Sequence, residues 1–253
     1  MPHSYKGAIA FGLVYIPITL SPAVRENDVG FNMLERSTLS RVKYKKTCVD
    51  CDGREVANHE IVKGFQYERD KYVIFTDEDF EILKSTKDKQ ITISKFVDLS
   101  EVDPVYFERA YHVNPLGAEK PYALLALAME KQNRAGIAKT VLGTKEVLVL
   151  LRAKDGIMFA NTLYFHDEVK RAPQFDKPKV ATEELALAKN LINNMVAKFE
   201  PQKFKDEYNE RLRKAIEQKV AGKELEAQDD DAPQNVINMM DALKKSVAMT
   251  ANG

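Results

Sequence analysis

No apolar run in this sequence approaches the roughly 18 residues that a helix needs to cross a bilayer. The N-terminus, Met1 to Lys6, also lacks the basic start, apolar stretch and small-residue cleavage site of a secretory signal peptide. We therefore expect a cytoplasmic protein with no membrane contact. The chain has 253 residues, of which 44% are hydrophobic and 30% charged, so most of it should fold as an ordinary globular protein.

Recognised catalytic motifs are missing as well. The sequence contains no H-E-x-x-H, no G-x-S-x-G, no Walker loop and no G-x-G-x-x-G. His166 and Asp167 could resemble a base with its carboxylate partner, but neighbouring residues on a strand point to opposite faces. A catalytic pair also needs a nucleophile within hydrogen-bond reach. We predict that the protein is not an enzyme, and we assign no catalytic residue.

Cysteine is scarce, and both cysteines, Cys48 and Cys51, belong to one C-x-x-C. In a reducing compartment a structural disulfide is not expected, so the question is whether this pair binds a metal or has a redox role. Two thiols on a tight turn make half of a structural zinc site, which needs four ligands. His59 could be a third ligand, or two copies could meet to give four thiolates. The alternative, favoured by the lack of a second C-x-x-C, is a turn with two metal-free thiols.

The sequence has no excess of either charge, with 38 basic and 38 acidic residues. Nucleic-acid binders that ignore sequence usually carry a basic excess, so the total charge counts against such a partner. The distribution counts the other way, because residues 36–54 are mainly basic and residues 68–108 mainly acidic. One basic face can hold a polyanion in a neutral protein, and scattered solvated charge is the alternative.

Arg41, Lys43 and Lys45 alternate with uncharged residues. Alternate residues of a strand share one face, so these cations would line one surface if the segment forms a strand. That suits a phosphate backbone, which carries one charge per ~1.7 Å of duplex axis and whose contacts read no sequence. The candidate phosphate contacts over the whole chain are Lys6, Arg36, Arg41, Lys43, Lys45, Lys46, Arg54, Lys63, Arg134, Lys139 and Lys145.

The first 178 residues are dominated by strand patterns. The expected strands lie at residues 8–20 (one buried strand with a bend), 72–75, 91–93, 137–142, 147–151 and 157–165. Thr76 to Asp79 should start a short helix. A longer helix should begin near Pro121 and carry one apolar face made of Leu124, Leu125, Ala128 and Met129.

Beyond Pro178 the pattern changes to helix. Thr182 can cap a helix whose apolar stripe is Leu185, Ala188, Ile192, Met195 and Phe199, and a second helix follows Pro201 with Tyr208, Leu212, Ile216 and Val220. Residues 222–233 have the composition of a linker. The tail after it carries a short apolar stripe, Val236, Met240, Leu243 and Val247, which must dock on this chain or on another protein.

Four ordered blocks resemble the bacterial Ku family. They are residues 5–18 (YKGAIAFGLVYIPI), residues 60–67 (EIVKGFQY) with 72–79 (YVIFTDED), residues 102–108 (VDPVYFE) and residues 162–169 (TLYFHDEV). The tail at residues 236–244 (VINMMDALK) is also similar to the family's short C-terminal segment. Two departures stand out: Tyr5 replaces the usual Trp, and Gly143 stands where the family typically has an Arg, so no arginine contact is carried over there.

The resemblance implies a mainly β (α+β) fold: a seven-stranded antiparallel β-barrel with an extended bridge and a C-terminal helical arm, paired into a ring-shaped homodimer. The barrel core would span residues 1–178, with the bridge at about 36–70, the dimerisation arm would span 179–222, and the linker and tail 223–253.

In function, the resemblance implies a nucleoid-associated protein that binds double-stranded DNA ends in non-homologous end joining and recruits an ATP-dependent DNA ligase. The stripe of Val236, Met240, Leu243 and Val247 would then bind the ligase or lie on the core. Two alternatives stay open: a protein–protein scaffold without direct DNA binding, and a lyase that attacks abasic sites through a lysine Schiff base. Apart from the possible zinc, no cofactor is expected.

Overall fold

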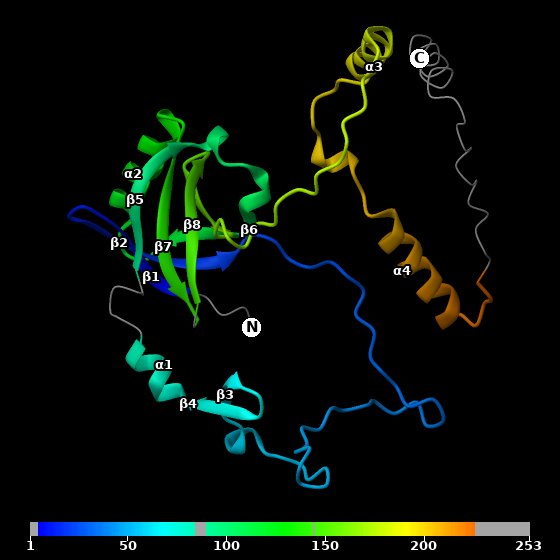
Figure 1. Ribbon diagram of the computed structural model, residues 1–253. Helices are drawn as coiled ribbons and strands as arrows, with labels where there is room; N and C mark the ends of the chain where they lie inside the picture. The colour runs from blue at the N-terminus through cyan, green and yellow to red at the C-terminus, as the bar shows by residue number, and fades with distance from the viewer. Residues whose placement is uncertain (1–4, 84–89, 144, 226–253) are drawn as a thin grey trace. The chain divides into compact units, whose positions relative to one another are not determined.

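A closed β-barrel forms the core of the computed structural model, which describes residues 5–83, 90–143 and 145–225 (Figure 1). Seven strands close it in the order β1-β2-β6-β9-β8-β7-β5. Their bounds are β1 (Tyr5–Phe11), β2 (Val14–Pro22), β5 (Gln90–Asp98), β6 (Phe107–Pro115), β7 (Arg134–Leu142), β8 (Lys145–Lys154) and β9 (Ile157–Leu163). The expected seven-stranded barrel in a mainly β chain is therefore confirmed.

The barrel is mixed rather than wholly antiparallel. Six of its seven strand pairs run antiparallel, but β1 pairs with β5 in parallel, from Ala8 opposite Gln90 to Ala10 opposite Thr92. A parallel pair cannot be joined by a tight turn, so it needs a long connection. The chain between β2 and β5 provides that connection, and the expectation of an all-antiparallel barrel is corrected at this one pair.

The expected single bent strand at residues 8–20 is in fact a hairpin. Phe11 pairs with Val14 at its closed end, and Gly12 has a φ of 55°. Glycine adopts this left-handed conformation without the Cβ clash that other residues meet, so Gly12 turns the chain where a bend was expected.

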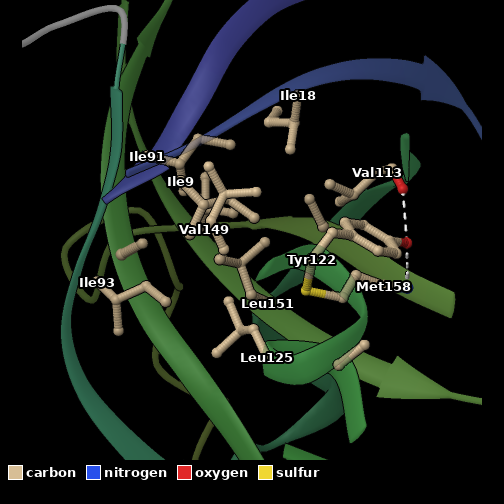
Figure 2. Packing of buried hydrophobic residues seen from close by; sticks show 14 of the residues in the cluster. Ile9, Ile18, Ile91, Ile93, Val113, Tyr122, Leu125, Val149, Leu151 and Met158 are labelled. Atoms are coloured by element: carbon tan, nitrogen blue, oxygen red, sulfur yellow. Dashed lines mark hydrogen bonds between the residues drawn. The ribbon is translucent and has the colours of Figure 1, made fainter. Parts of the chain in front are cut away.

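Helix α2 (Glu119–Lys131) covers the core through Tyr122, Leu125, Ala126 and Met129. Figure 2 shows Tyr122 and Leu125 packed among Ile9, Val149 and Leu151. The predicted helix face was wrong in part, because Leu124 is 71% exposed and Ala128 is also exposed. Together with Phe11 and Phe96 these two line a hollow of about 670 Å³. In the sequence, Leu124, Leu125, Ala128 and Met129 form a broad apolar stripe. Such a stripe does not show which of its two sides packs against the barrel, and in the structure it is the side with Leu125 and Met129.

The hydroxyl of Tyr122 ties three elements together inside the core. It donates to the backbone carbonyl of Val113 on β6 and accepts from the backbone N–H of Met158 on β9, each at 2.8 Å (Figure 2). Tyr122 is only 8% exposed, so this hydroxyl satisfies two backbone groups that water does not reach.

Between β2 and β5 the chain makes a long excursion with little regular structure. It contains the short 3₁₀ helix η1 (Asn58–Glu60), a separate two-stranded sheet of β3 (Lys63–Glu68) and β4 (Lys71–Phe75), and helix α1 (Asp77–Leu83). Two more 3₁₀ helices, η3 (Leu99–Glu101) and η4 (Pro104–Tyr106), precede β6. In the described part of the chain, no helix combines the length and apolar character needed to cross a membrane.

A second compact unit consists of Asn27–Phe31 and the chain from Ala172 onward. It holds α3 (Thr182–Asn194), η5 (Pro201–Lys203) and α4 (Glu207–Val220). Thr182 is the first residue of α3 rather than its cap: the N-cap position is Ala181, whose N–H donates to the Glu184 carboxylate at 3.2 Å. Asp206 caps α4 by accepting from the backbone N–H of Asn209 at 2.9 Å.

Candidate nucleic-acid interface

A tight turn at residues 34–41 holds two of the candidate cations, Arg36 and Arg41. Leu34 pairs with Arg41 as an isolated antiparallel pair, and backbone bonds of 2.9 Å join Glu35 to Leu39 and to Ser40. Such a turn fixes the backbone from which both arginines project. Both side chains are exposed.

The carboxylate of Glu35 stabilises that turn by accepting hydrogen bonds from residues within it. It accepts four hydrogen bonds, from the backbone N–H and the hydroxyl of both Ser37 and Thr38, at 2.7 to 3.0 Å. The bonds from Ser37 and then those from Thr38 lower the pKa of Glu35 from its ordinary 4.5 to about 2. Glu35 is thus a positioning residue beside the candidate cations, where the sequence alone presents it only as opposing charge.

The basic run from Arg41 to Lys46 does not form the regular strand that its alternation indicates. It lies between two isolated pairs, Leu34 with Arg41 and Thr47 with Glu55, and Val42 N–H donates to the Met33 carbonyl at 3.0 Å. No strand in the described part of the chain forms a continuous ladder with this run. The argument that alternate cations share one strand face therefore loses its basis, although the cations remain close in sequence and exposed.

All eleven candidate cations are exposed, and they differ in their partners. Five form ion pairs: Lys45 with Glu55 at 2.6 Å, Arg54 with Glu60 at 3.3 Å, Lys63 with Asp77 at 3.1 Å, Arg134 with Asp98 at 3.9 Å and Lys139 with Glu146 at 2.7 Å. Lys46 donates to the neutral amide of Asn58 at 3.1 Å. Among the described residues, no carboxylate pairs with Lys6, Arg36, Arg41, Lys43 or Lys145.

This division matters for binding an anion. An unpaired surface cation can meet a phosphate without losing an earlier partner. A paired one must first exchange a carboxylate, although exposed pairs of this kind are each worth only about 0–1 kcal/mol. Three of the unpaired cations, Arg36, Arg41 and Lys43, lie within one stretch of eight residues. That stretch is the strongest candidate for phosphate contact.

The candidate cations of the barrel come from three strands. Lys6 lies on β1, Arg134 and Lys139 on β7 and Lys145 on β8. Lys139 points outward, because its neighbours Ala138 and Thr140 are buried, and its ammonium also lies 5.5 Å from the ring centre of Phe165. The structure thus displays these cations on the outer barrel surface, separately from the turn at residues 34–41.

The two cysteines sit at the closed end of a short hairpin. Cys48 N–H donates to the Arg54 carbonyl and Arg54 N–H donates to the Cys51 carbonyl, both at 2.9 Å, and Asp52 and Gly53 have positive φ angles. The two sulfur atoms are 2.8 Å apart, and neither cysteine is in a disulfide. The hydrogen bond with Cys48 raises the pKa of the Cys51 thiol, against a smaller lowering by the Arg54 side chain. Within the described residues no group of three or more potential ligands is present.

The predicted ligase-binding positions Val236, Met240, Leu243 and Val247 lie outside the described residues. In the described part of the chain, the sequence analysis missed the glutamates that bind or position the candidate cations. Glu35 accepts the hydrogen bonds that close the turn at residues 34–41, Glu55 pairs with Lys45 across the cysteine hairpin, and Glu60 pairs with Arg54 on the same arm. The hairpin register that brings Glu55 to Lys45 follows from the turn at Asp52-Gly53, which the sequence does show.

Comparison with known proteins agrees with this architecture. Residues 10–187 match the family model described as the Ku70/Ku80 beta-barrel domain. A protein from Lachnoclostridium phytofermentans is 44% identical over 247 residues, which cover 96% of this chain and 95% of the relative. A Bacillus subtilis protein is 37% identical over 254 residues (97% and 81%), and one from Archaeoglobus fulgidus is 38% identical over 252 residues (98% of each).

All three relatives bear the name "Non-homologous end joining protein Ku". The family model spans most of the chain and covers the barrel from the end of β1 through β9. The closed barrel, the match to the family model and the extent of the sequence identity together show that this chain belongs to the Ku family.

Proposed function

We propose that this chain binds the ends of double-stranded DNA without reading their sequence, as a ring-shaped homodimer, in double-strand break repair by non-homologous end joining. It acts by binding rather than by catalysis. The observation that carries the proposal is the family membership of the whole barrel, together with the names that its relatives bear. The exposed cations of the turn at residues 34–41 and of the barrel supply the charge that DNA requires.

The charge arrangement explains how a protein of zero net charge holds DNA. Affinity comes from phosphate contacts, which are independent of sequence, so only one surface has to be basic. Arg36, Arg41 and Lys43 have no carboxylate partner among the described residues, so their charge is available to phosphate. Preference for ends then comes from topology, because a closed ring cannot load onto DNA that has no end.

Exposed apolar side chains support the homodimer. On the two-stranded sheet, Phe65, Tyr67, Tyr72 and Ile74 are each 58 to 65% exposed. The predicted stripe of α3 and the residues after it is also uncovered, with Ile192, Met195 and Phe199 between 64 and 75% exposed. The register puts Phe65 on one face of this sheet and Tyr72 and Ile74 on the other, so both faces expose apolar side chains. Exposed apolar surface marks protein–protein interfaces. A second copy of the chain is the partner that the family resemblance implies.

A mobility-shift experiment tests end binding. Purified protein is mixed with one duplex in linear form and with the same sequence as a sealed circle, at several salt concentrations. We expect a shift with the linear form only, and a steep fall in affinity as salt rises. Equal binding to both forms contradicts loading from an end. Absence of any shift favours the scaffold alternative, in which the basic turn is only solvated.

The arginine turn offers a matched pair of variants for the same experiment. Replacing Arg41 with Gln removes an unpaired cation, and replacing Arg69 with Gln removes a cation that already pairs with Asp70 and lies outside the candidate set. In a homodimer the substitution removes two arginines, so we expect R41Q to reduce the slope of log K against log salt by about 1.8, which is about 0.9 for each of two phosphate contacts. R69Q should leave the slope unchanged. Sedimentation equilibrium of both variants should give the mass of two chains.

We further propose that the protein recruits and stimulates an ATP-dependent DNA ligase through its tail. The support is the isolated apolar stripe of Val236, Met240, Leu243 and Val247, which is too short to form a core of its own. Deleting residues 233–253 should preserve the DNA shift and weaken stimulation of the ligase in a nick- and end-joining assay. Unchanged stimulation would remove the tail from this role.

A further inference from the structure

We propose that Arg152, on the outer face of the barrel, binds a phosphate of the DNA backbone through a guanidinium group that Phe159 and Asn161 hold in place. Lys154, two residues further along β8, is the second cation of this site. Neither cation belongs to the candidate set predicted from the sequence. The inference rests on the proposed DNA binding and assigns to it a pre-oriented arginine on the barrel itself.

Three side chains form one row across neighbouring strands of the barrel. Phe159 of β9 lies opposite His112 of β6 on one side and opposite Arg152 of β8 on the other. The adjoining residues Val113 and Leu151 are buried in the barrel core. Because successive side chains of a strand point to opposite faces, the row points away from the core.

The guanidinium of Arg152 is fixed on two sides. Its Cζ lies 4.5 Å from the centre of the Phe159 ring, and its Nε donates to Oδ1 of Asn161 at 3.1 Å. The Phe159 ring is flanked in turn by His112, with 5.1 Å between the ring centres, and Asn161 is buried. A planar guanidinium that is stacked and bonded at Nε loses little freedom when it binds an anion, which favours affinity.

No carboxylate pairs with Arg152 in the described chain. Burial lowers the pKa of its guanidinium, and an arginine nevertheless stays charged at neutral pH. Glu130 lines the same small hollow of about 90 Å³, but its carboxylate accepts from the backbone N–H groups of Asp155 and Gly156 at 2.9 and 3.0 Å. The two terminal nitrogens of Arg152 are therefore available to donate together, as a fork, to one anion.

The surroundings favour the phosphate backbone of DNA as that anion. Lys154 is exposed, has no carboxylate partner among the described residues, and lies on the same strand face about 7 Å from Arg152 along β8. Arg134 lines the same hollow as Arg152. Several cations in one place suit a polyanion with evenly spaced charges, and the arginine fork matches phosphate geometry. Contacts of this kind read no sequence.

The main test measures how the affinity for a short linear duplex depends on salt, by mobility shift with the full-length protein. R152Q removes two guanidinium groups from a homodimer, so the slope of log K against log salt should fall by about 1.8. This corresponds to about 60-fold weaker binding at 0.1 M salt if the affinity extrapolated to 1 M is unchanged. R109Q is the matched control, because Arg109 is exposed on β6 and already pairs with Glu108 at 3.6 Å. Its slope should equal that of the unchanged protein.

Two conservative variants separate a held fork from simple charge, and they also test the proposal if R152Q does not fold. R152K keeps the charge without the fork, and F159L keeps Arg152 without its stacking partner. Both should retain the salt slope and bind more weakly at every salt concentration, by about tenfold for each charged hydrogen bond lost. Circular dichroism and sedimentation equilibrium should show the fold and mass of the unchanged protein.

The outcomes distinguish this inference from the proposed function. If the unchanged protein does not shift linear duplex, both are overturned. If it does shift the duplex and R152Q keeps its slope and affinity, only the phosphate site at Arg152 is overturned. An R152K protein that binds as tightly as the unchanged one shows that the fork is not used, and this also overturns the inference.

Discussion

The hydroxyl of Tyr122 offers a quantitative test of how the barrel is held together. Replacing Tyr122 with Phe keeps the ring packed in the core and removes only the oxygen that bonds Val113 and Met158. Val113 and Met158 are almost fully buried, so we expect both backbone groups to lose their partner without gaining water in its place. Each unsatisfied buried group costs about 1–3 kcal/mol. We therefore expect Y122F to lower the free energy of unfolding by about 2–6 kcal/mol.

Urea denaturation, followed by circular dichroism at one fixed protein concentration, measures this loss, since the stability of an oligomer depends on concentration. Tyr5 provides the control, because its half-buried hydroxyl forms a hydrogen bond of 3.0 Å with the side-chain hydroxyl of Thr140 and bonds no backbone group in the described structure. Y5F should cost about 1 kcal/mol. If Y122F proved no more destabilising than Y5F, the reasoning that two buried backbone groups depend on one hydroxyl would be refuted.

Three further predictions follow from the turns and ion pairs. Glu55→Gln removes the carboxylate bound to Lys45 in both chains of a homodimer and should steepen the salt dependence of DNA binding by about 1.8 in the log–log slope, about 0.9 for each lysine, measured by mobility shift. Because its hydrogen bonds lower the pKa of Glu35 to about 2, the stabilisation of its turn is present above pH 4.5 and is lost as the pH falls toward 2; NMR titration of this carboxyl should show that low midpoint. Gly12→Ala should cost about 1 kcal/mol in urea denaturation, because a Cβ at φ 55° is strained.

Each of these outcomes has a clear opposite. An E55Q protein with an unchanged or shallower salt slope would show that Lys45 does not reach phosphate. A Glu35 midpoint near the ordinary 4.5 would mean that the four hydrogen bonds of the turn do not persist in solution. A G12A protein as stable as the unchanged one would show that the hairpin adapts, since no atom lies within 4 Å of the added Cβ and only the backbone conformation opposes it.

Local patterns in the sequence predicted four of the seven barrel strands. The apolar runs that became β5, β7, β8 and β9 lie where strands were expected, as does β4 of the separate sheet, whereas no strand was expected at β6. The hairpin of β1 and β2 was missed because two strands joined by a two-residue turn give almost the same apolar run as one bent strand. The parallel pairing of β1 with β5 leaves no local mark, since it joins residues about 80 positions apart.

The candidate interface was predictable in composition and not in its pairing. The sequence shows which residues are cations, but whether Lys45 or Lys43 meets a carboxylate depends on the register of a hairpin closed by Asp52 and Gly53. The role of Glu35 could not be predicted for a similar reason. Its four hydrogen-bond donors come from residues two and three positions further on, and counting charges shows only an acidic residue next to a basic one. The exposed face of α2 depended on how the helix rotates against the barrel.

The parallel seam between β1 and β5 has a consequence for how freely the excursion between β2 and β5 can change. Its two ends are anchored by strands of the same closed barrel, so for the barrel an insertion or deletion beyond Asn27–Phe31, which belong to the second unit, mainly alters the entropy of closing one loop. That entropy varies with the logarithm of length, and doubling the loop costs only about 0.6 kcal/mol. Natural variation or engineering can therefore lengthen, shorten or recharge this segment with little effect on the stability of the barrel that carries it.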